Sequence, residues 1–196
     1  MLFMGEEWSE PAPFLYFVSH GDPELCAAVQ KGRKEEFAAF HAQGEAPDPV
    51  SEDTFLQSKL QWQLLNETPH QSMLNYYKAL ISLRKSQPAL YNLDRKNLHV
   101  ETDEEKNLLV LHRWTNEQHL ICVMNFSKRQ QSFMPPSNVQ RWQKVFDSAS
   151  PEWLGPQSAP AHISGGAPGS SAVTMQPESI VIYADSHSPL TIHHSK

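Results

Sequence analysis

The stretch Met1-Leu2-Phe3-Met4-Gly5-Glu6-Glu7-Trp8 decides how we interpret the rest of the chain. It opens with a continuous apolar run, which is typical of a strand buried on both faces of a parallel sheet, and it breaks at a glycine before two carboxylates and an indole. Loops that leave the carboxyl ends of such strands build the active sites of barrels and open α/β sheets. The sequence therefore predicts Leu2 and Phe3 in a core, with Glu6, Glu7 and Trp8 at the mouth of a site.

A parallel strand needs hydrogen-bonded neighbours, and the sequence supplies none before its first residue. We therefore expect the chain to be the C-terminal part of a longer protein. Its 196 residues are 39% hydrophobic and 10% aromatic, which is enough for a folded core. Two cysteines far apart in sequence, Cys26 and Cys122, favour free thiols over a disulfide.

The charge and hydropathy of the chain exclude several classes of partner. The formal net charge is −6 and there is no basic run, which argues against a nucleic-acid surface and a polybasic membrane patch. No apolar segment approaches the roughly 20 residues that span a bilayer, and the opening run lacks the features of a signal peptide. We expect a cytoplasmic protein with neither nucleic-acid nor membrane partners.

Capping signals mark two helices in the first half of the chain. Asp22 followed by Pro23 predicts a helix that runs to about Lys31, where Gly32 would end or kink it. The capping box Thr68-Pro69-His70-Gln71 predicts a second helix that closes at a proline. Its apolar stripe should consist of Met73, Leu74, Tyr77, Leu80, Ile81 and Arg84.

After residue 90 the helical period gives way to short strand-like runs, so the fold class is α+β. Short polar connections at residues 103–107 and 115–118 predict that the first three strands form an antiparallel meander. The stretch 155–171, rich in Gly, Pro and Ser, is expected to be a loop. The expected strands are residues 97–101, 108–114, 119–126, 131–134, 141–146 and 179–184.

The residues alone name no complete active site. Glu6 and Glu7 cannot flank one glycosidic bond, because adjacent residues of an extended strand point to opposite faces. His20 and Asp22 are close in sequence, but Asp22 is explained as a helix cap. His193-His194 lacks the spacing of a zinc site, and there is no phosphate-binding or dinucleotide-binding motif, so we expect neither a metal nor a cofactor.

Aromatic residues crowd the loop between residues 9 and 21. Tyr16 and Phe17 either pack this loop onto the body of the protein or form a wall against which a planar ligand face can lie. Both interpretations are open from the residues alone.

Several motifs together resemble the malto-oligosyltrehalose trehalohydrolases of the α-amylase superfamily. MLFMGEEW resembles the eighth barrel strand and the turn after it, and PFLYFVSHGDPEL, GRKEEF, PDP, TFLQSKLQW and YYKALISLRKSQPAL extend the resemblance to about residue 91. The resemblance implies that residues 1–90 are the last strand and helices of a (β/α)8 barrel. It also implies that residues 91–185 form a β-sandwich C-terminal domain, followed by a disordered tail at 186–196.

The resemblance implies a glycoside hydrolase that releases trehalose from maltooligosyl trehalose by cleaving the adjacent α-1,4 bond. The catalytic carboxylates of this superfamily come from earlier strands, so no catalytic residue is carried over and the chain alone should be inactive. The substrate-side residues implied are Glu7, which matches the Gly-x-Glu glutamate, with Trp8 beside it, and the loop residues Tyr16, Phe17 and His20.

A second interpretation is a stand-alone β-sandwich that binds carbohydrate or another partner without catalysis. Such modules stack sugar rings on flat, exposed aromatic platforms. An exposed coplanar pair among Trp114, Trp142 and Trp153 would favour this interpretation, whereas buried indoles would favour the truncated hydrolase.

Overall fold

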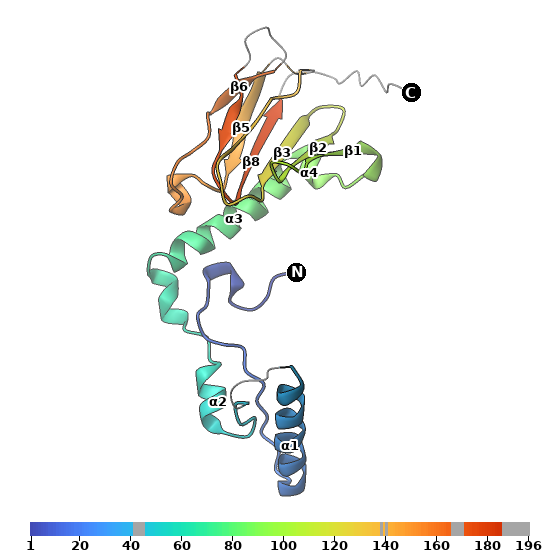
Figure 1. Cartoon of the computed structure of the whole chain (residues 1–196). Helices are drawn as coiled ribbons and strands as arrows, with labels where there is room; N and C mark the ends of the chain where they lie inside the picture. The colour runs from blue at the N-terminus through green and yellow to red at the C-terminus, as the bar shows by residue number, and fades with distance from the viewer. Residues whose placement is uncertain (41–45, 138, 140, 166–170, 186–196) are drawn as a thin grey trace. The chain divides into compact units, whose positions relative to one another are not determined.

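The computed structural model describes residues 1–40, 46–137, 139, 141–165 and 171–185, so the predicted tail at 186–196 lies outside the described residues. The chain forms two compact units, an N-terminal unit, Met1–Gln71, and a C-terminal unit, Ser72–Lys196 (Figure 1). The boundary that we expect near residue 90 falls within the second of these units. None of the described helices is both long enough and apolar enough to cross a membrane.

The N-terminal unit is built from short helices and extended loops, with no strand among its described residues. The helices are η1 (Glu6–Trp8), α1 (Pro23–Phe40), α2 (Glu52–Gln57) and η2 (Trp62–Asn66). The Asp22 carboxylate accepts from the Glu24 amide at 2.9 Å, which confirms the expected cap of α1. Helix α1 continues through Gly32 to Phe40, so the expected end of the helix near Lys31 is wrong.

The expected strand at the start of the chain does not form. Residues 1–3 are irregular, Met4 and Gly5 form a turn, and the side chains of Leu2 and Phe3 are 49% and 55% exposed rather than in a core. A strand is held by hydrogen bonds to a neighbour, and no described strand of this chain pairs with these residues. Among the described residues, no strand therefore covers this apolar run.

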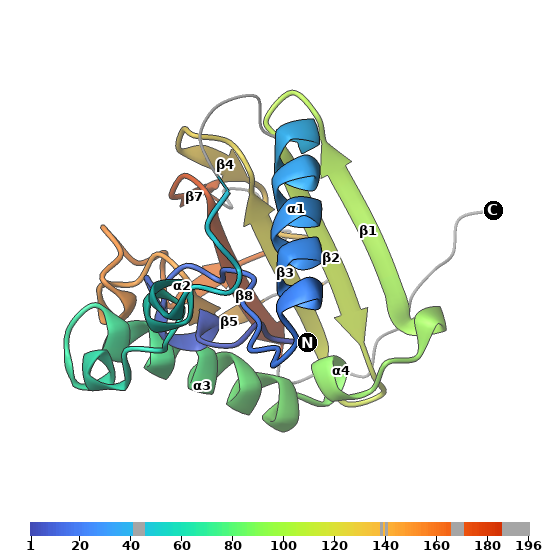
Figure 2. The ribbon, with the colours of Figure 1, turned by 90° about the horizontal axis from the view of Figure 1, so that it is seen from below.

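The C-terminal unit is organised around a six-stranded antiparallel sheet in the order β1-β2-β3-β8-β5-β6. Figure 2 shows β1, β2 and β3 running side by side, as the predicted meander requires, and residue pairing confirms it. Strand β8 returns to the middle of the sheet between β3 and β5. The strands are β1 (Leu98–Asp103), β2 (Leu108–Trp114), β3 (His119–Asn125), β5 (Arg141–Asp147), β6 (His162–Ser164) and β8 (Ser179–Asp185).

A two-stranded sheet, β4 (Gln131–Phe133) with β7 (Val173–Met175), covers part of one face of the large sheet. Phe133 from β4 and Met175 from β7 pack in one apolar cluster with Trp142 and Tyr183 of the large sheet. The structure thus gives an antiparallel sheet with a smaller second layer. Strands β6 and β7 are the two that the sequence does not predict, and β6 lies inside the expected loop at 155–171.

The opposite face of the sheet is covered by α3 (His70–Ser86) and α4 (Pro88–Tyr91) (Figure 1). Tyr76, Leu80 and Leu83 pack against Leu120, Ile182 and further apolar side chains of the sheet. The helix is predicted correctly, but its buried stripe is offset from the expected one, of which only Leu80 joins this cluster and Ile81 is exposed. Strand β3 is buried on both faces because each face has its own cover.

Candidate functional site

A tight turn replaces the expected strand end at the candidate site. Gly5 adopts a left-handed conformation with φ 86°, and a Cβ placed there would lie 2.6 Å from the Cβ of Glu10. Only glycine tolerates both the positive φ and the close approach of Glu10. Gly5 therefore reverses the chain and starts the short helix η1. The turn brings Trp8 back over the residues that follow it.

Glu10 is the centre of the hydrogen-bond network around this turn. Its carboxylate accepts from the amides of Ala12 at 2.9 Å and Gln61 at 2.8 Å, and from the indole nitrogen of Trp8 at 3.2 Å. Burial raises the pKa of Glu10, but these hydrogen bonds outweigh it and hold the pKa below its usual value. Glu10 therefore ties the turn to η2, which lies about fifty residues further along the chain.

Trp8 is a structural centre of the N-terminal unit rather than an open sugar platform. It is 3% exposed, and its ring packs at 5.0 Å and 38° against the exposed ring of Trp62. The Trp8 carbonyl oxygen lies 2.8 Å from Nδ1 of His70, at the start of α3. Glu7, the neighbouring residue, is half-buried, and the structure describes no hydrogen bond from another residue to its carboxylate.

The aromatic loop forms a hollow of about 340 Å³ lined by Phe14, Leu15, Tyr16, Phe17 and Arg33. The guanidinium carbon of Arg33 lies 4.9 Å from the centre of the Tyr16 ring, a cation–π arrangement that fixes the ring. Phe17 packs edge-on against Phe55 at 5.2 Å. Tyr16 and Phe17 remain 46% and 41% exposed, so their rings can still be reached from solvent.

The structure brings together only two of the five residues predicted to lie on the substrate side. Tyr16 and Phe17 share the hollow, whereas Glu7, Trp8 and His20 are not among the residues that line it. His20 is exposed, and its carbonyl oxygen accepts from the Cys26 thiol at 3.4 Å. Their roles as substrate residues stay predictions.

Sequence reasoning missed Glu10 and Arg33, which organise the two parts of this unit. Arg33 lies in the GRKEEF stretch and Glu10 lies in none of the motifs, but each contacts a residue distant in sequence: Glu10 contacts Gln61, and Arg33 contacts Tyr16. No spacing rule could have found them. Among the described residues, no group of three or more His, Cys, Asp or Glu side chains could hold a metal ion.

Part of the chain is similar in sequence to known proteins. It is 40% identical over 114 residues to the malto-oligosyltrehalose trehalohydrolase of Mycobacterium tuberculosis strain H37Rv, and 44% identical over 100 residues to that of Deinococcus radiodurans. The enzyme of the same name from Rhizobium sp. strain M-11 is 36% identical over 140 residues. The chain is a homologue of part of these trehalohydrolases. No family model matches it.

The matches to these trehalohydrolases cover 58%, 50% and 71% of the chain, but only 20%, 16% and 23% of the relatives. The chain therefore spans about a fifth of the length of the curated relatives it matches. Among solved structures, a Salmonella typhimurium protein assigned as an alpha amylase matches 93% of the chain and 27% of its own length, with a TM-score of 0.65 and 25% identity. The structural likeness thus extends to the α-amylase enzymes.

The tryptophans distinguish between the two interpretations of the C-terminal unit. Trp142 is fully buried, and Trp114 and Trp153 are partly buried. Trp153 packs against Phe146 and Tyr76, with ring centres 6.2 and 5.6 Å apart. None of the three therefore provides the open, coplanar platform of a stand-alone sugar-binding module, and the truncated-hydrolase interpretation is favoured.

Proposed function

We propose that this chain supplies the C-terminal part of a glycoside hydrolase of the trehalohydrolase type. The observation that carries the proposal is the 36–44% identity to three trehalohydrolases over a stretch of about a fifth of their length. In this proposal residues 1–90 are the last strand and helices of a (β/α)8 barrel, and residues 91–185 are the β domain beside it. The substrate is maltooligosyl trehalose or a related α-glucan, and the product is trehalose.

The exposed apolar side chains of the N-terminal unit support an incomplete barrel. Met1, Leu2, Phe3 and Met4 are all exposed, as is Phe14. Monomeric proteins seldom leave such a run of large apolar side chains in water, so these residues call for a partner surface. Neighbouring barrel strands would supply that surface and would allow residues 1–4 to pair as a strand.

In this proposal, the described carboxylates of the candidate site do not supply the catalytic pair of a retaining or inverting glycosidase. Both mechanisms need a pair of carboxyl groups that flank the bond. In the candidate site the Glu10 carboxylate accepts from four donor groups of its own unit, and Glu6 accepts from the Phe3 amide at 2.9 Å. The acid and the nucleophile would therefore come from residues outside this chain, while Glu7 would orient groups at the site and Tyr16, Phe17 and His20 would contact sugar.

The proposal can be tested by completing the enzyme. The chain is joined to the part of the M. tuberculosis relative that precedes the matching region, and trehalose release from maltooligosyl trehalose is measured for this chimaera and for the chain alone. We expect release by the chimaera and none by the chain. In the chimaera, Glu7→Gln should lower kcat/KM by about tenfold or more, the loss of one charge-assisted contact, whereas the exposed control Glu67→Gln should not.

Two results would overturn the proposal. One is trehalose release by the purified chain alone, because the catalytic groups would then lie within it. The other is a chimaera that melts cooperatively as a folded protein yet releases no trehalose.

A further inference from the structure

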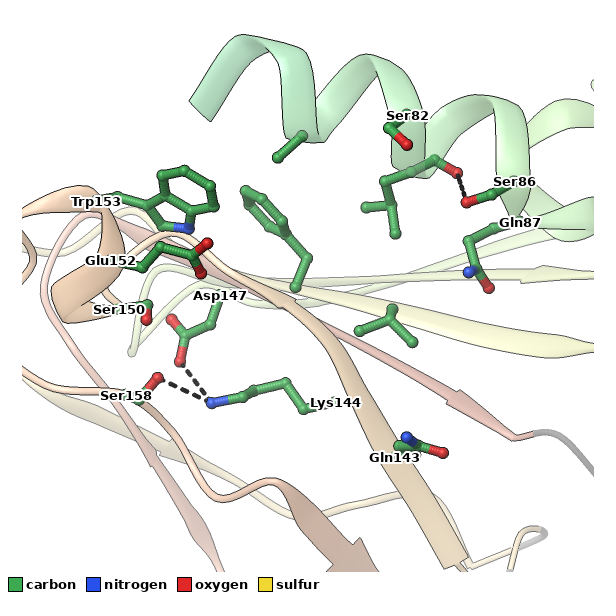
Figure 3. Close-up of a pocket in the computed structure, with 14 residues that line it drawn as sticks. Ser82, Ser86, Gln87, Gln143, Lys144, Asp147, Ser150, Glu152, Trp153 and Ser158 are labelled. Atoms are coloured by element: carbon green, nitrogen blue, oxygen red, sulfur yellow. Dashed lines mark hydrogen bonds and ion pairs between the residues drawn. The ribbon is translucent and has the colours of Figure 1, made fainter. Parts of the chain in front are cut away.

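The C-terminal unit contains a hollow of about 590 Å³ between α3 and β5 (Figure 3). Ser82 and Ser86 reach it from the helix, Gln143 and Lys144 from the strand, and Trp153 from the short turn η4 (Pro151–Trp153) that closes one end. Its volume is within the range of sites that hold small organic ligands.

A β-bulge shapes the strand side of this hollow. The pairing of β5 with β8 skips one residue between Lys144 and Phe146, so that Lys144 faces Tyr183 and Phe146 faces Ile182. A regular strand would turn alternate side chains away from one face. Here the five consecutive residues from Gln143 to Asp147 all line the hollow, a concentration of side chains that bulges commonly create next to functional sites.

The charges in the hollow are already neutralised. The Lys144 ammonium donates to Asp147 at 3.3 Å, to Ser158 at 2.9 Å and to the Ala159 carbonyl, which uses its three hydrogens (Figure 3). Asp147 is buried, and its carboxylate also accepts from the amides of Ala149 and Ala159. With no ammonium hydrogen left over, and with the Glu152 carboxylate also lining the hollow, an anion such as phosphate is disfavoured.

Neutral hydrogen-bonding groups remain open around the same space. The side chains of Ser82, Gln143 and Ser150 line it, and none of them makes a hydrogen bond within the described part of the chain. Gln87 accepts through Oε1 from Gln118 at 2.6 Å, which leaves its amide hydrogens to donate. Phe146 and Trp153 add an apolar wall. Donors and acceptors beside an aromatic wall match a ligand that carries hydroxyl groups on an apolar ring face.

We propose that the hollow between α3 and β5 is an accessory saccharide site that binds a short segment of α-glucan. The saccharide class follows from the lining, which offers neutral donors, neutral acceptors and an apolar wall but no free cation. The choice of an α-linked glucan rests on the proposed function. The site lies entirely within the C-terminal unit, so it works without the catalytic residues and would hold a glucan chain on the enzyme between cleavage events.

The experiment uses the full chain and maltotriose as the probe, followed by titration calorimetry and by the NMR signals of the indole N–H groups. We expect saturable binding that shifts the Trp153 signal. Ser82→Phe, which fills the hollow from an exposed helix position, should weaken binding by about tenfold or more, as expected when at least one hydrogen-bonded contact is lost. Lys85→Phe, at an exposed position of the same helix outside the hollow, is the matched control and should leave affinity unchanged within about twofold.

Absence of maltotriose binding would overturn the inference, as would binding that Ser82→Phe leaves intact. Equal binding of cellotriose would overturn the assignment to α-linked glucan, and binding of inorganic phosphate in competition with maltotriose would overturn the argument from neutralised charge. Trehalose release by the chimaera is a separate measurement. The hydrolase proposal and the accessory site can therefore fail independently of each other.

Discussion

The two units of this chain bury their apolar side chains to very different extents. In the N-terminal unit, Trp8 is the only large apolar side chain among the described residues that is buried, whereas Met1, Leu2, Phe3 and Phe14 face solvent. In the C-terminal unit both faces of the large sheet are covered, by the β4-β7 layer and by α3 with α4. Apolar composition alone therefore does not make a core. The C-terminal unit contains the partners of its apolar residues, and the N-terminal unit lacks them.

The largest effect should be a difference in the resistance of the two units to proteolysis. Local opening needs little free energy where few apolar contacts hold a segment, and nearly the global free energy where strands are buried on both faces. We expect limited proteolysis to cut first within Met1–Gln71, or in residues 155–165 between β5 and β7. Peptides from β3 and β8 should appear at least about a hundredfold more slowly. If mass spectrometry identified the N-terminal unit as the part that survives, the N-terminal unit would be the more resistant of the two and the prediction would be wrong.

The core of the C-terminal unit should depend strongly on Trp142. This side chain is fully buried between the large sheet and the β4-β7 layer. Trp142→Ala should lower the free energy of unfolding by about 3–5 kcal/mol, because it leaves a large cavity. Urea unfolding of this variant and of the wild type measures the change. A loss under about 1 kcal/mol would mean that the layer repacks easily and that the unit is no better packed than its neighbour.

Acid should weaken the C-terminal unit through a buried histidine pair. Nδ1 of His112 lies 3.3 Å from Nε2 of His119, and burial together with the nearby positive charge of His112 lowers the pKa of His119 from 6.5 to about 4. A histidine with a lowered pKa in the folded state binds fewer protons than in the unfolded state. The free energy of unfolding should therefore fall as the pH drops from about 6.5 to about 4, by about 3 kcal/mol.

The matched variant for the acid effect is His119→Phe, which keeps a ring against Trp142 but cannot be protonated. Burial also lowers the pKa of His112, and Glu101, whose carboxylate lies 3.3 Å from Nε2 of that ring, offsets only part of this lowering. Urea unfolding at a series of pH values should give a flatter profile for the variant. An equally steep profile would assign the acid sensitivity to other groups.

In the N-terminal unit, the most sensitive polar group should be the Glu10 carboxylate. Glu10→Gln loses the negative charge that four donors share and turns an amide group towards at least one of them. We expect a loss of about 1–2 kcal/mol in the stability of this unit, measured by amide hydrogen exchange at Gln61 and Ala12. Glu67→Gln, at an exposed position, should change exchange at these amides very little. Equal effects of both variants would remove Glu10 as the centre of the network.

The smallest effect should come from polar substitution of the exposed apolar surface. Phe14 is 68% exposed and makes an edge contact with Phe3 at 5.1 Å. Phe14→Ser should change the thermal stability of the chain by no more than about 0.5 kcal/mol, since little buried area is lost. The same change in the completed chimaera should cost several times more if barrel neighbours cover this surface. Equally small losses of stability in the chain and in the chimaera would count against the proposal that residues 1–90 belong to an incomplete barrel.

The sequence predicts best the elements whose signals lie in residues close together along the chain. The Asp22 cap, the α3 helix and the β1-β2-β3 meander depend on adjacent residues or short connections, and all three form. The turn at Gly5 was mistaken for a strand end because an apolar run does not reveal whether its partners are in the chain. Strands β6 and β7, three residues each, were missed because they carry no period long enough to detect.

The candidate site was predictable only where its residues lie together in sequence. Tyr16 and Phe17 are adjacent in the aromatic loop and share one hollow, and their contact with a ligand stays a prediction. Glu10 and Arg33 were missed because their contacts with Gln61 and Tyr16 depend on the fold. The hollow between α3 and β5 was missed for the same reason. Part of its lining comes from α3, and the rest comes from β5 and η4, which lie much further along the chain.

The position of β8 in the sheet has a consequence for synthesis on the ribosome. β8 is the last strand that the structure describes, yet it lies between β3 and β5 and joins the two halves of the sheet. Until its residues leave the exit tunnel, the nascent chain presents the unpaired edge of β3, and an open edge is a template for pairing with another chain. Completion of this domain must therefore wait until translation has passed Asp185, and a ribosome that pauses before this point would hold an aggregation-prone intermediate.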